Sequence, residues 1–397
     1  MKKKTIADVD VHRKRVLVRV DFNVPFEEGT ARISDDTRIR AVLPTIRHLI
    51  ANQARTILCS HLGRPQGQVV EKMRLAPVAR RLGEILGSPV FYVQDCVGPT
   101  VEKAAIELQP GEVLLLENLR FHPEEEANDT SFAKTLSSLA DIYVNDAFGT
   151  AHRAHASTVG VANYLPAVAG YLIERELAML GTTLESPARP FAAVLGGAKV
   201  SDKIAVLENL LKRVDVLVIG GGMATTFLKA RGFEVGRSLL AEDKIAFASA
   251  LMKYVEERRL SLYLPQDLVV ASSFKGDAPY RVVDADEIPP DHYIMDIGPK
   301  TLSLYENVLK GCRTILWNGT MGVFEWKPFA SGTRGIAQLL ANLPNATTVV
   351  GGGSTAEAVD SLGLAQRMTH VSTGGGASLE FLEGKTLPGV AVLMDKT

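Results

Sequence analysis

Residues Arg19 to Pro25 read RVDFNVP, and they end the strand-like run Arg15 to Val20 on an acid, an amide and a rigid proline. Three later strand-like runs end in the same way, on polar or cationic residues beside glycine: His61 and Arg64 in SHLGRP, Arg120 in ENLRF, and Arg153 in NDAFGTAHRAHAST. In an open parallel sheet, ligands bind beyond the carboxyl ends of the strands. We therefore expect these strand ends to form one pocket for a small, polyanionic, hydroxylated ligand.

Length and composition limit the class of protein. A chain of 397 residues is too long for one hydrophobic core, so two or three domains are expected. The net charge of −1 argues against a nucleic-acid or membrane-surface partner, and no apolar run approaches the length of a membrane span. Cys59, Cys96 and Cys312 lie far apart without metal-ligand spacing, which is typical of reduced, buried thiols. A cytoplasmic protein is expected.

Strand-like and helix-like segments alternate from end to end, which predicts right-handed βαβ units and mostly parallel sheets. Residues 36–50 place their apolar residues on one helical face, with a kink expected at Pro44. The segment 170–185, GYLIERELAMLGTTLE, predicts a single helix, and a new βα series starts after it at PFAAVLGG. The predicted fold class is α/β, with two doubly wound parallel-sheet (Rossmann-like) domains joined by a hinge helix.

Strands of the second half end on glycine instead of arginine, in Gly196-Gly197, Gly220 to Gly222, Gly351 to Gly353 and Gly374 to Gly376. Glycine at a strand-to-helix turn lets the backbone approach a ligand, and a helix N-terminus offers N–H groups to an anion. Lys199 and Lys203 follow the first cluster and would share one face of a helix. This combination predicts a polyphosphate site.

Several familiar nucleotide and hydrolase motifs are missing. The sequence contains no G-x-x-x-x-G-K-[ST] loop and no G-x-G-x-x-G, H-E-x-x-H or G-x-S-x-G motif. A nucleotide site without those motifs, on a different domain from an arginine-rich site, indicates phosphoryl transfer between two bound substrates. The acidic run Glu124 to Glu126 is interpreted as a solvated surface without a function.

Long motifs in a fixed order connect the chain to a known family: RVDFNVP, SHLGRP, ENLRF, NDAFGTAHRAHAST, GGAKVSDKI, GGGMATTF, DIGPKT, WNGTMGVFE and HVSTGGGASLEFLEGK. Together they cover nearly the whole chain and resemble the phosphoglycerate kinase family. The resemblance implies reversible transfer of the acyl phosphate of 1,3-bisphosphoglycerate to ADP, giving 3-phosphoglycerate and ATP in glycolysis, with Mg²⁺ as cofactor. It also implies a monomer that closes by hinge bending.

The resemblance also divides the chain between the two ligands. Residues 1–169 with the C-terminal tail 387–397 would bind the phosphoglycerate, and residues 170–386 would bind ADP or ATP. The residues implied for the phosphoglycerate are Asp21, Asn23, Arg38, His61, Leu62, Gly63, Arg64, Arg120 and Arg153. Those implied for the nucleotide are Lys199, Lys203, Gly221, Ile294, Asn318, Glu325, Gly352, Gly353, Ser354 and Thr355. Residues implied to act on the transferring group are Arg38, Lys199, Gly352 and Gly375.

One position departs from the family pattern. The family usually has an aspartate that contacts the nucleotide's magnesium where this chain has Ser354. A hydroxyl is a weaker ligand for a hard cation than a carboxylate, so no protein ligand for the metal is expected here. Mg²⁺ would be held by the nucleotide phosphates and water.

The implied chemistry needs no general base, because a phosphate and a carboxylate are already ionised nucleophiles at neutral pH. His61, His152 and His155 are therefore interpreted as binding or structural residues. Two alternatives stay open from the residues. One is a different acyl-phosphate kinase, such as one for acetate, for which a pocket of five cations is oversized. The other is a non-catalytic nucleotide-binding scaffold that kept the fold.

Overall fold

The computed structural model describes residues 2–396 and divides into two compact units. The first unit contains the chain up to Ala178 together with the segment from Thr386 onward, and the second unit is Met179–Lys385. Helix α7 (Tyr171–Glu185) contains the boundary between them. The single helix predicted for residues 170–185 is thus present.

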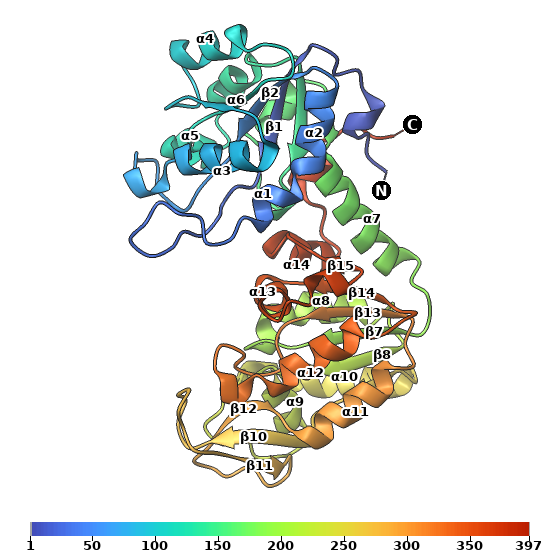
Figure 1. Cartoon of the computed structure of the whole chain (residues 1–397). Coiled ribbons are helices and arrows are strands. Elements are labelled where there is room, and N and C mark those ends of the chain that lie inside the picture. The colour runs from blue at the N-terminus through green and yellow to red at the C-terminus, as the bar shows by residue number, and fades with distance from the viewer. Residues whose placement is uncertain (1, 397) are drawn as a thin grey trace. The chain divides into compact units, whose positions relative to one another are not determined.

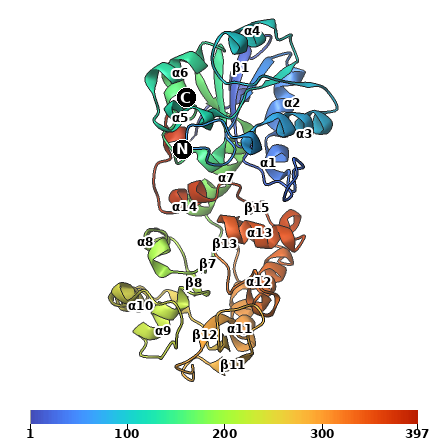
Figure 2. The same cartoon turned by 90° about the vertical axis from the view of Figure 1, so that its left-hand side faces the viewer.

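The first unit is built on a six-stranded sheet with the order β3-β4-β2-β1-β5-β6, in which every pairing is parallel. Its strands are β1 (Arg15–Val20), β2 (Arg55–Cys59), β3 (Val90–Tyr92), β4 (Val113–Leu115), β5 (Ile142–Asp146) and β6 (Ala167–Ala169). The inner strands read as nearly continuous apolar runs because helices cover both faces of a parallel sheet. Figure 2 shows α2 and α3 on one side of this sheet and α6 on the other.

The helices of the first unit are α1 (Thr37–Ala41), α2 (Leu43–Ala51), α3 (Ala76–Leu86), α4 (Pro99–Glu107), α5 (Pro123–Glu126), α6 (Thr130–Ser137) and α15 (Pro388–Ala391). The kinked helix expected over residues 36–50 is instead two helices that meet at Val42. Pro44 lies in the first turn of α2, where the missing N–H of proline costs no helical hydrogen bond. The expected disturbance at Pro44 is therefore present, as a break at Val42 instead of a bend within one continuous helix.

The C-terminal segment packs within the first unit, beside the N-terminal residues (Figure 1). Gly389 N donates to Ala151 O at 2.8 Å, and Asn145 Nδ2 donates to Gly389 O at 2.9 Å. Lys3 pairs with Asp395 at 2.8 Å. Segments from opposite ends of the sequence therefore stabilise the same unit.

The second unit also has a six-stranded parallel sheet, in the order β15-β14-β13-β7-β8-β9. Its strands are β7 (Phe191–Leu195), β8 (Val216–Ile219), β9 (Ser261–Tyr263), β13 (Thr314–Asn318), β14 (Thr347–Gly351) and β15 (His370–Val371). Its helices are α8 (Ile204–Leu210), α9 (Ala224–Ala230), α10 (Ile245–Glu257), α11 (Pro299–Leu309), α12 (Ser331–Ala341), α13 (Gly353–Ser361) and α14 (Gly376–Leu382). The α/β fold class with two parallel sheets is confirmed.

A further three-stranded antiparallel sheet, β11-β10-β12, was not predicted. It consists of β10 (Asp267–Ala271), β11 (Tyr280–Asp284) and β12 (Tyr293–Ile297), and Figure 1 shows it at one end of the second unit. Within residues 267–297, no helix separates these three strands along the chain. The alternation of strand-like and helix-like segments therefore could not predict this sheet.

All three cysteines are free and buried, as predicted. Among residues 2–396, no helix combines the length and the apolar character required to cross a membrane.

Candidate active site

Four adjacent strands of the first unit, β4, β2, β1 and β5, bring their carboxyl-terminal loops to one edge of the sheet. Asn23, after β1, accepts a hydrogen bond at 2.8 Å from the N–H of Gly63, which follows β2. Arg120, after β4, donates from Nη1 to the carbonyl of Gly63 at 2.7 Å. His61 Nδ1 lies 3.9 Å from Asp21 Oδ1. The structure thus brings together polar residues that are up to about a hundred positions apart in sequence.

Arg38 reaches this edge from α1 and donates to Asp21 Oδ2. The side chain of Asp21 is only 10% exposed, whereas that of Arg38 is 39% exposed. One edge of the guanidinium is therefore fixed by the carboxylate, and the other edge is accessible. A guanidinium held in this way can donate to an anion without first losing much side-chain entropy.

A buried arginine that sequence reasoning missed lies beneath these residues. Arg19, within β1, is 1% exposed; its Nε donates to Ser157 Oγ at 2.8 Å, and its Nη2 lies 3.2 Å from His61 Nδ1. An arginine in the fully buried part of a parallel strand is unusual, because charged side chains are seldom fully buried without a partner. That anomaly in RVLVRV was the available signal.

The interpretation of the acidic run as a solvated surface was wrong for Glu125, whereas Glu124 and Glu126 are exposed. Glu125 is fully buried, and its carboxylate accepts from Ser157 Oγ at 2.6 Å and from Ser157 N at 2.9 Å. Burial raises the pKa of Glu125, while the nearby Arg19 guanidinium lowers it. Glu126 pairs with Arg120 Nε at 3.0 Å. Two acids of the run therefore support the cationic side chains of the site.

Two histidines at this edge, His61 and His155, have lowered pKa values, which favours the neutral imidazole. Burial, followed by the charges of Arg19, Arg120, Arg153 and Arg38, puts the pKa of His61 well below its ordinary value of 6.5. Burial and three of the same arginines lower the pKa of His155 to about 4. The sequence predicted five cations in this pocket, one of which was His61. Its imidazole is favoured in the neutral form, and the buried Arg19 supplies a positive charge that was not predicted.

Arg120 carries a donor that the protein does not use. Its side chain is buried, and Nη2 has no hydrogen-bond partner among residues 2–396. An unsatisfied buried donor is costly, so a guanidinium N–H in this position is suited to an anionic ligand. The other predicted residues line the same loops: Leu62 is fixed by Asn118, Arg153 is half-buried, and Arg64 is exposed.

In the second unit, Lys203 and Asn318 meet where the turns after β7 and β13 come together. Lys203 donates to Asn318 Oδ1, and Asn318 Nδ2 is buried without a partner among the described residues. Burial lowers the pKa of Lys203 to about 8. The chain leaves β7 toward one edge of the sheet and returns to β13 on the other side, and such a switch point is the usual ligand position in an open α/β sheet.

Lys199 does not share a helical face with Lys203, contrary to expectation. Lys199 has an extended backbone (φ −133°, ψ 140°) and precedes a short 3-10 turn, Val200–Lys203. The α-helix α8 begins only at Ile204. Lys199 is exposed and Lys203 is half-buried, so the two ammonium groups have different environments.

The glycine clusters have two different roles. In the first two clusters the N–H groups are used inside the protein: Gly197 N donates to Thr320 O at 2.9 Å and Gly221 N donates to Met321 O at 3.0 Å. A Cβ at Gly221 would lie 2.6 Å from Thr320 O. These glycines let the turns pack against one another. The N–H groups of Gly197 and Gly221 are already bonded within the protein and are not available to an anion, contrary to expectation.

The third and fourth clusters are open. A Cβ at Gly353, the first residue of α13, or at Gly375, just before α14, would meet no atom within 4 Å. Gly352 has φ +90°, and a Cβ there would approach Asn318 Nδ2 to 3.1 Å. The free N–H groups in the first turn of α13 thus begin beside the unused donor of Asn318.

The remaining predicted nucleotide residues differ in exposure. Glu325 and Ser354 are exposed, and Ile294 is half-buried against the core of the antiparallel sheet. Thr355 is fully buried, and its Oγ1 accepts from Gly319 N at 2.7 Å, so its hydroxyl holds a turn. The first turn of α13 contains no acidic residue. The first turn of α13 around Ser354 therefore supplies no carboxylate for Mg²⁺.

Known proteins share the sequence and the fold of this chain. The family model described as phosphoglycerate kinase matches residues 6–385. Curated phosphoglycerate kinases of Moorella thermoacetica and Roseiflexus castenholzii are each 58% identical to the chain, over 396 and 397 residues, covering 100% of both sequences in each case.

Solved structures show the same relationship. The phosphoglycerate kinase of Coxiella burnetii is 43% identical and superposes with a TM-score of 0.89, and that of Pyrococcus horikoshii is 37% identical with a TM-score of 0.85. Each alignment covers 98% of this chain and 98% of the other chain.

Proposed function

The chain belongs to the phosphoglycerate kinase family, and from this premise we propose how its residues divide the work. The enzyme is a phosphotransferase with a carboxyl group as acceptor: it transfers the acyl phosphate of 1,3-bisphosphoglycerate to ADP, giving 3-phosphoglycerate and ATP in glycolysis. The first unit binds the phosphoglycerate in this proposal, and the second unit binds the nucleotide.

The observation that carries the assignment of the first unit is the buried, unused Nη2 of Arg120. Arg120, Arg153 and Arg64 bind the phosphate of the glycerate, because guanidinium groups donate paired hydrogen bonds to phosphate oxygens. Asn23 and the neutral His61 form hydrogen bonds with the hydroxyl group and the carboxyl end of the phosphoglycerate. Asp21 holds Arg38 in position, and Arg38 contacts the phosphoryl group in transfer.

On the second unit, Lys203 and Lys199 bind the nucleotide phosphates together with Asn318 Nδ2 and the first N–H groups of α13. Glu325 binds the ribose of the nucleotide, and Ile294 contacts its base. Gly221 contributes close packing instead of an N–H group. Mg²⁺ arrives with the nucleotide and supplies charge neutralisation on its phosphates, without a carboxylate from the Ser354 turn.

The residues catalyse by alignment and charge stabilisation. The β-phosphate of ADP and the carboxylate of 3-phosphoglycerate are ionised at neutral pH, so no side chain has to accept a proton. The lowered pKa values of His61 and His155 agree with that role, because neutral imidazoles buried among arginines are poor proton shuttles at these positions. Arg38, Lys199 and the backbone at Gly352 and Gly375 stabilise charge on the transferring group.

The cell context follows from the same chemistry. Free, buried cysteines and a glycolytic reaction favour the cytoplasm and a monomeric enzyme whose partners are its two substrates. Direct transfer requires that the two ligands meet, so we expect hinge bending of the two units, which α7 connects. Solution scattering with each substrate alone and with both together measures this change.

A coupled assay tests the function directly. The purified chain with 1,3-bisphosphoglycerate, ADP and Mg²⁺ is expected to form ATP, and acetyl phosphate at the same concentration is expected to support only a minor rate. Equal rates with acetyl phosphate would favour the broader acyl-phosphate kinase. Nucleotide binding without turnover of either substrate would favour the non-catalytic scaffold.

A further inference from the structure

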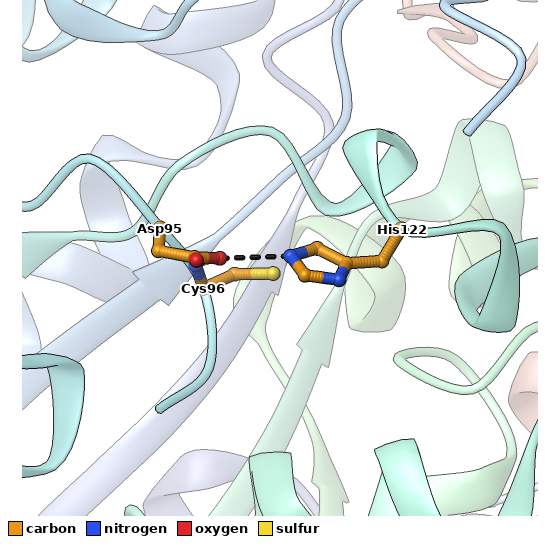
Figure 3. Close-up of side chains that lie close together, drawn as sticks. All are labelled: Asp95, Cys96 and His122. Atoms are coloured by element: carbon orange, nitrogen blue, oxygen red, sulfur yellow. Dashed lines mark hydrogen bonds and ion pairs between the residues drawn. The ribbon is translucent and has the colours of Figure 1, made fainter. Parts of the chain in front are cut away.

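One cluster of metal-binding side chains lies outside the proposed active site. Asp95 and Cys96 follow β3, and His122 follows the 3-10 turn Leu119–Phe121 beyond β4. Figure 3 shows the three side chains pointing toward one another. One donor atom from each lies within 4.8 Å of the other two, a closeness found for this group alone among His, Cys, Asp and Glu of residues 2–396. The reaction proposed above uses none of the three.

We propose that Asp95, Cys96 and His122 bind a divalent transition-metal ion of the zinc class. A thiolate, an imidazole and a carboxylate are the ligand types that Zn²⁺ takes in proteins, and three protein ligands leave a fourth position for water. Asp95 is exposed, so that position opens to solvent. The donor set is poorly suited to Mg²⁺, which prefers oxygen ligands in an octahedral arrangement. The site is therefore separate from the nucleotide's magnesium.

The separations are close to those that such an ion requires. Zinc bonds of about 2.0–2.3 Å in a tetrahedron place neighbouring ligand atoms roughly 3.3–3.8 Å apart. His122 Nε2 and Asp95 Oδ1 are already 2.8 Å apart, and the widest separation in the cluster is at most 4.8 Å. The side chains of His122 and Asp95 are 30% and 51% exposed, so they have room to adjust around a fixed, buried sulfur.

The backbone holds the cluster in place. Asp95 O accepts from Glu117 N at 3.2 Å, which joins the segment after β3 to the segment that leads to His122. Cys96 N donates to Asp95 Oδ1 at 2.7 Å. The His122 ring packs against Phe132 with centroids 5.4 Å apart. Ligands on two connected, hydrogen-bonded segments need little ordering when an ion binds.

Binding exchanges protons for the ion. Cys96 is buried, and a free cysteine carries a thiol at neutral pH. The ion forms a bond to Sγ as the S–H bond breaks, and that proton passes to the buffer. It bonds to Nε2 and Oδ1 in place of the proton that lies between them, and this proton moves through solvent to Nδ1, so that the bound imidazole carries one proton. Affinity for the metal should therefore increase with pH.

The experiment titrates the full chain, free of nucleotide, with Zn²⁺ by calorimetry and with Co²⁺ by absorbance. We expect one equivalent of metal, proton release that varies with the buffer, and a cobalt–thiolate charge-transfer band. Cys96→Ser should abolish the band, and Cys96→Ser and His122→Gln should each weaken Zn²⁺ binding by about 100-fold or more. A millimolar excess of Mg²⁺ should not displace Zn²⁺.

Matched controls locate the site. His292 forms an ion pair with Asp291 at 2.8 Å, like that of His122 with Asp95, and His292→Gln should leave Zn²⁺ affinity unchanged. Cys312→Ser removes another buried thiol and should keep the cobalt band. If Cys96→Ser fails to fold, the variants His122→Gln and Asp95→Asn test the site instead, because both side chains are partly exposed. The proposal is overturned if the band is absent from the wild type, or if Zn²⁺ affinity survives both His122→Gln and Asp95→Asn.

Discussion

The proposed sites of both units lie at the carboxyl ends of parallel strands, but they use different chemical means. In the first unit, the proposed ligand contacts are long cationic side chains, supported from below by Asp21, Glu125 and Ser157. In the second unit, they are a helix N-terminus, an amide and two lysines around glycine turns. Side-chain sites need buried counter-charges to hold them, whereas backbone sites need positions without a Cβ. The following variants test that difference.

Replacing Arg38 with alanine is expected to have the largest effect. Arg38 should donate to charge that develops on the transferring phosphoryl group, so kcat should fall by roughly 10²–10³-fold with a smaller change in either KM. Steady-state kinetics measures both constants. Arg40, two positions along α1, is exposed and paired with Asp36 at 2.7 Å, and Arg40→Ala is the matched control. An unchanged kcat in Arg38→Ala would contradict its assignment.

The glycine clusters offer a comparison within the second unit. Gly221 has φ +63° and no room for a Cβ, so Gly221→Ala should lower the free energy of unfolding by about 2–5 kcal/mol. Gly353 is open, so Gly353→Ala should leave stability within about 1 kcal/mol and change only nucleotide affinity. Denaturant unfolding and ADP titration separate the two effects. Equal destabilisation by both variants would refute the division into packing and open clusters.

Glu125 tests the support beneath the arginines. Glu125→Gln removes the negative charge near Arg19 and disturbs both hydrogen bonds to Ser157, at an expected cost of about 1–3 kcal/mol in the free energy of unfolding. The KM for the phosphoglycerate should rise and that for the nucleotide should not. Glu124→Gln, at the exposed neighbour, is the control. If the two variants behave alike, Glu125 has no supporting role.

A smaller, pH-dependent effect is expected at Lys203. Its pKa in the free protein is lowered by burial from 10.5 to about 8, and the ADP phosphates favour the charged form. Affinity for ADP should therefore be highest well below pH 8 and fall as the pH rises through 8. At about one pH unit above this pKa, the affinity should be roughly tenfold below its maximum. Lys203→Arg, which stays charged, should flatten the profile in calorimetric titrations. A profile that remains steep in the arginine variant would assign the titration to another group.

The sequence predicted those features that repeat or that lie at element ends. Alternating segments predicted both parallel sheets, and the polar strand ends predicted which loops of the first unit converge. Features set by tertiary packing gave no local signal. In the sequence Glu125 is indistinguishable from a surface acid, because its hydrogen-bond partner Ser157 lies thirty-two positions later in the chain. Lys199 and Lys203 have helical spacing, but the tight turn after Gly197 delays α8 until Ile204.

The central claim is that side chains of the first unit bind the phosphoglycerate while the second unit binds the nucleotide. Calorimetric titration of 3-phosphoglycerate and of ADP into Arg120→Ala and into Lys203→Met tests it most directly. The account predicts a crossed result: Arg120→Ala loses 3-phosphoglycerate and binds ADP as the wild type does, and Lys203→Met does the reverse. Loss of ADP binding in Arg120→Ala, with 3-phosphoglycerate still bound, would contradict the claim.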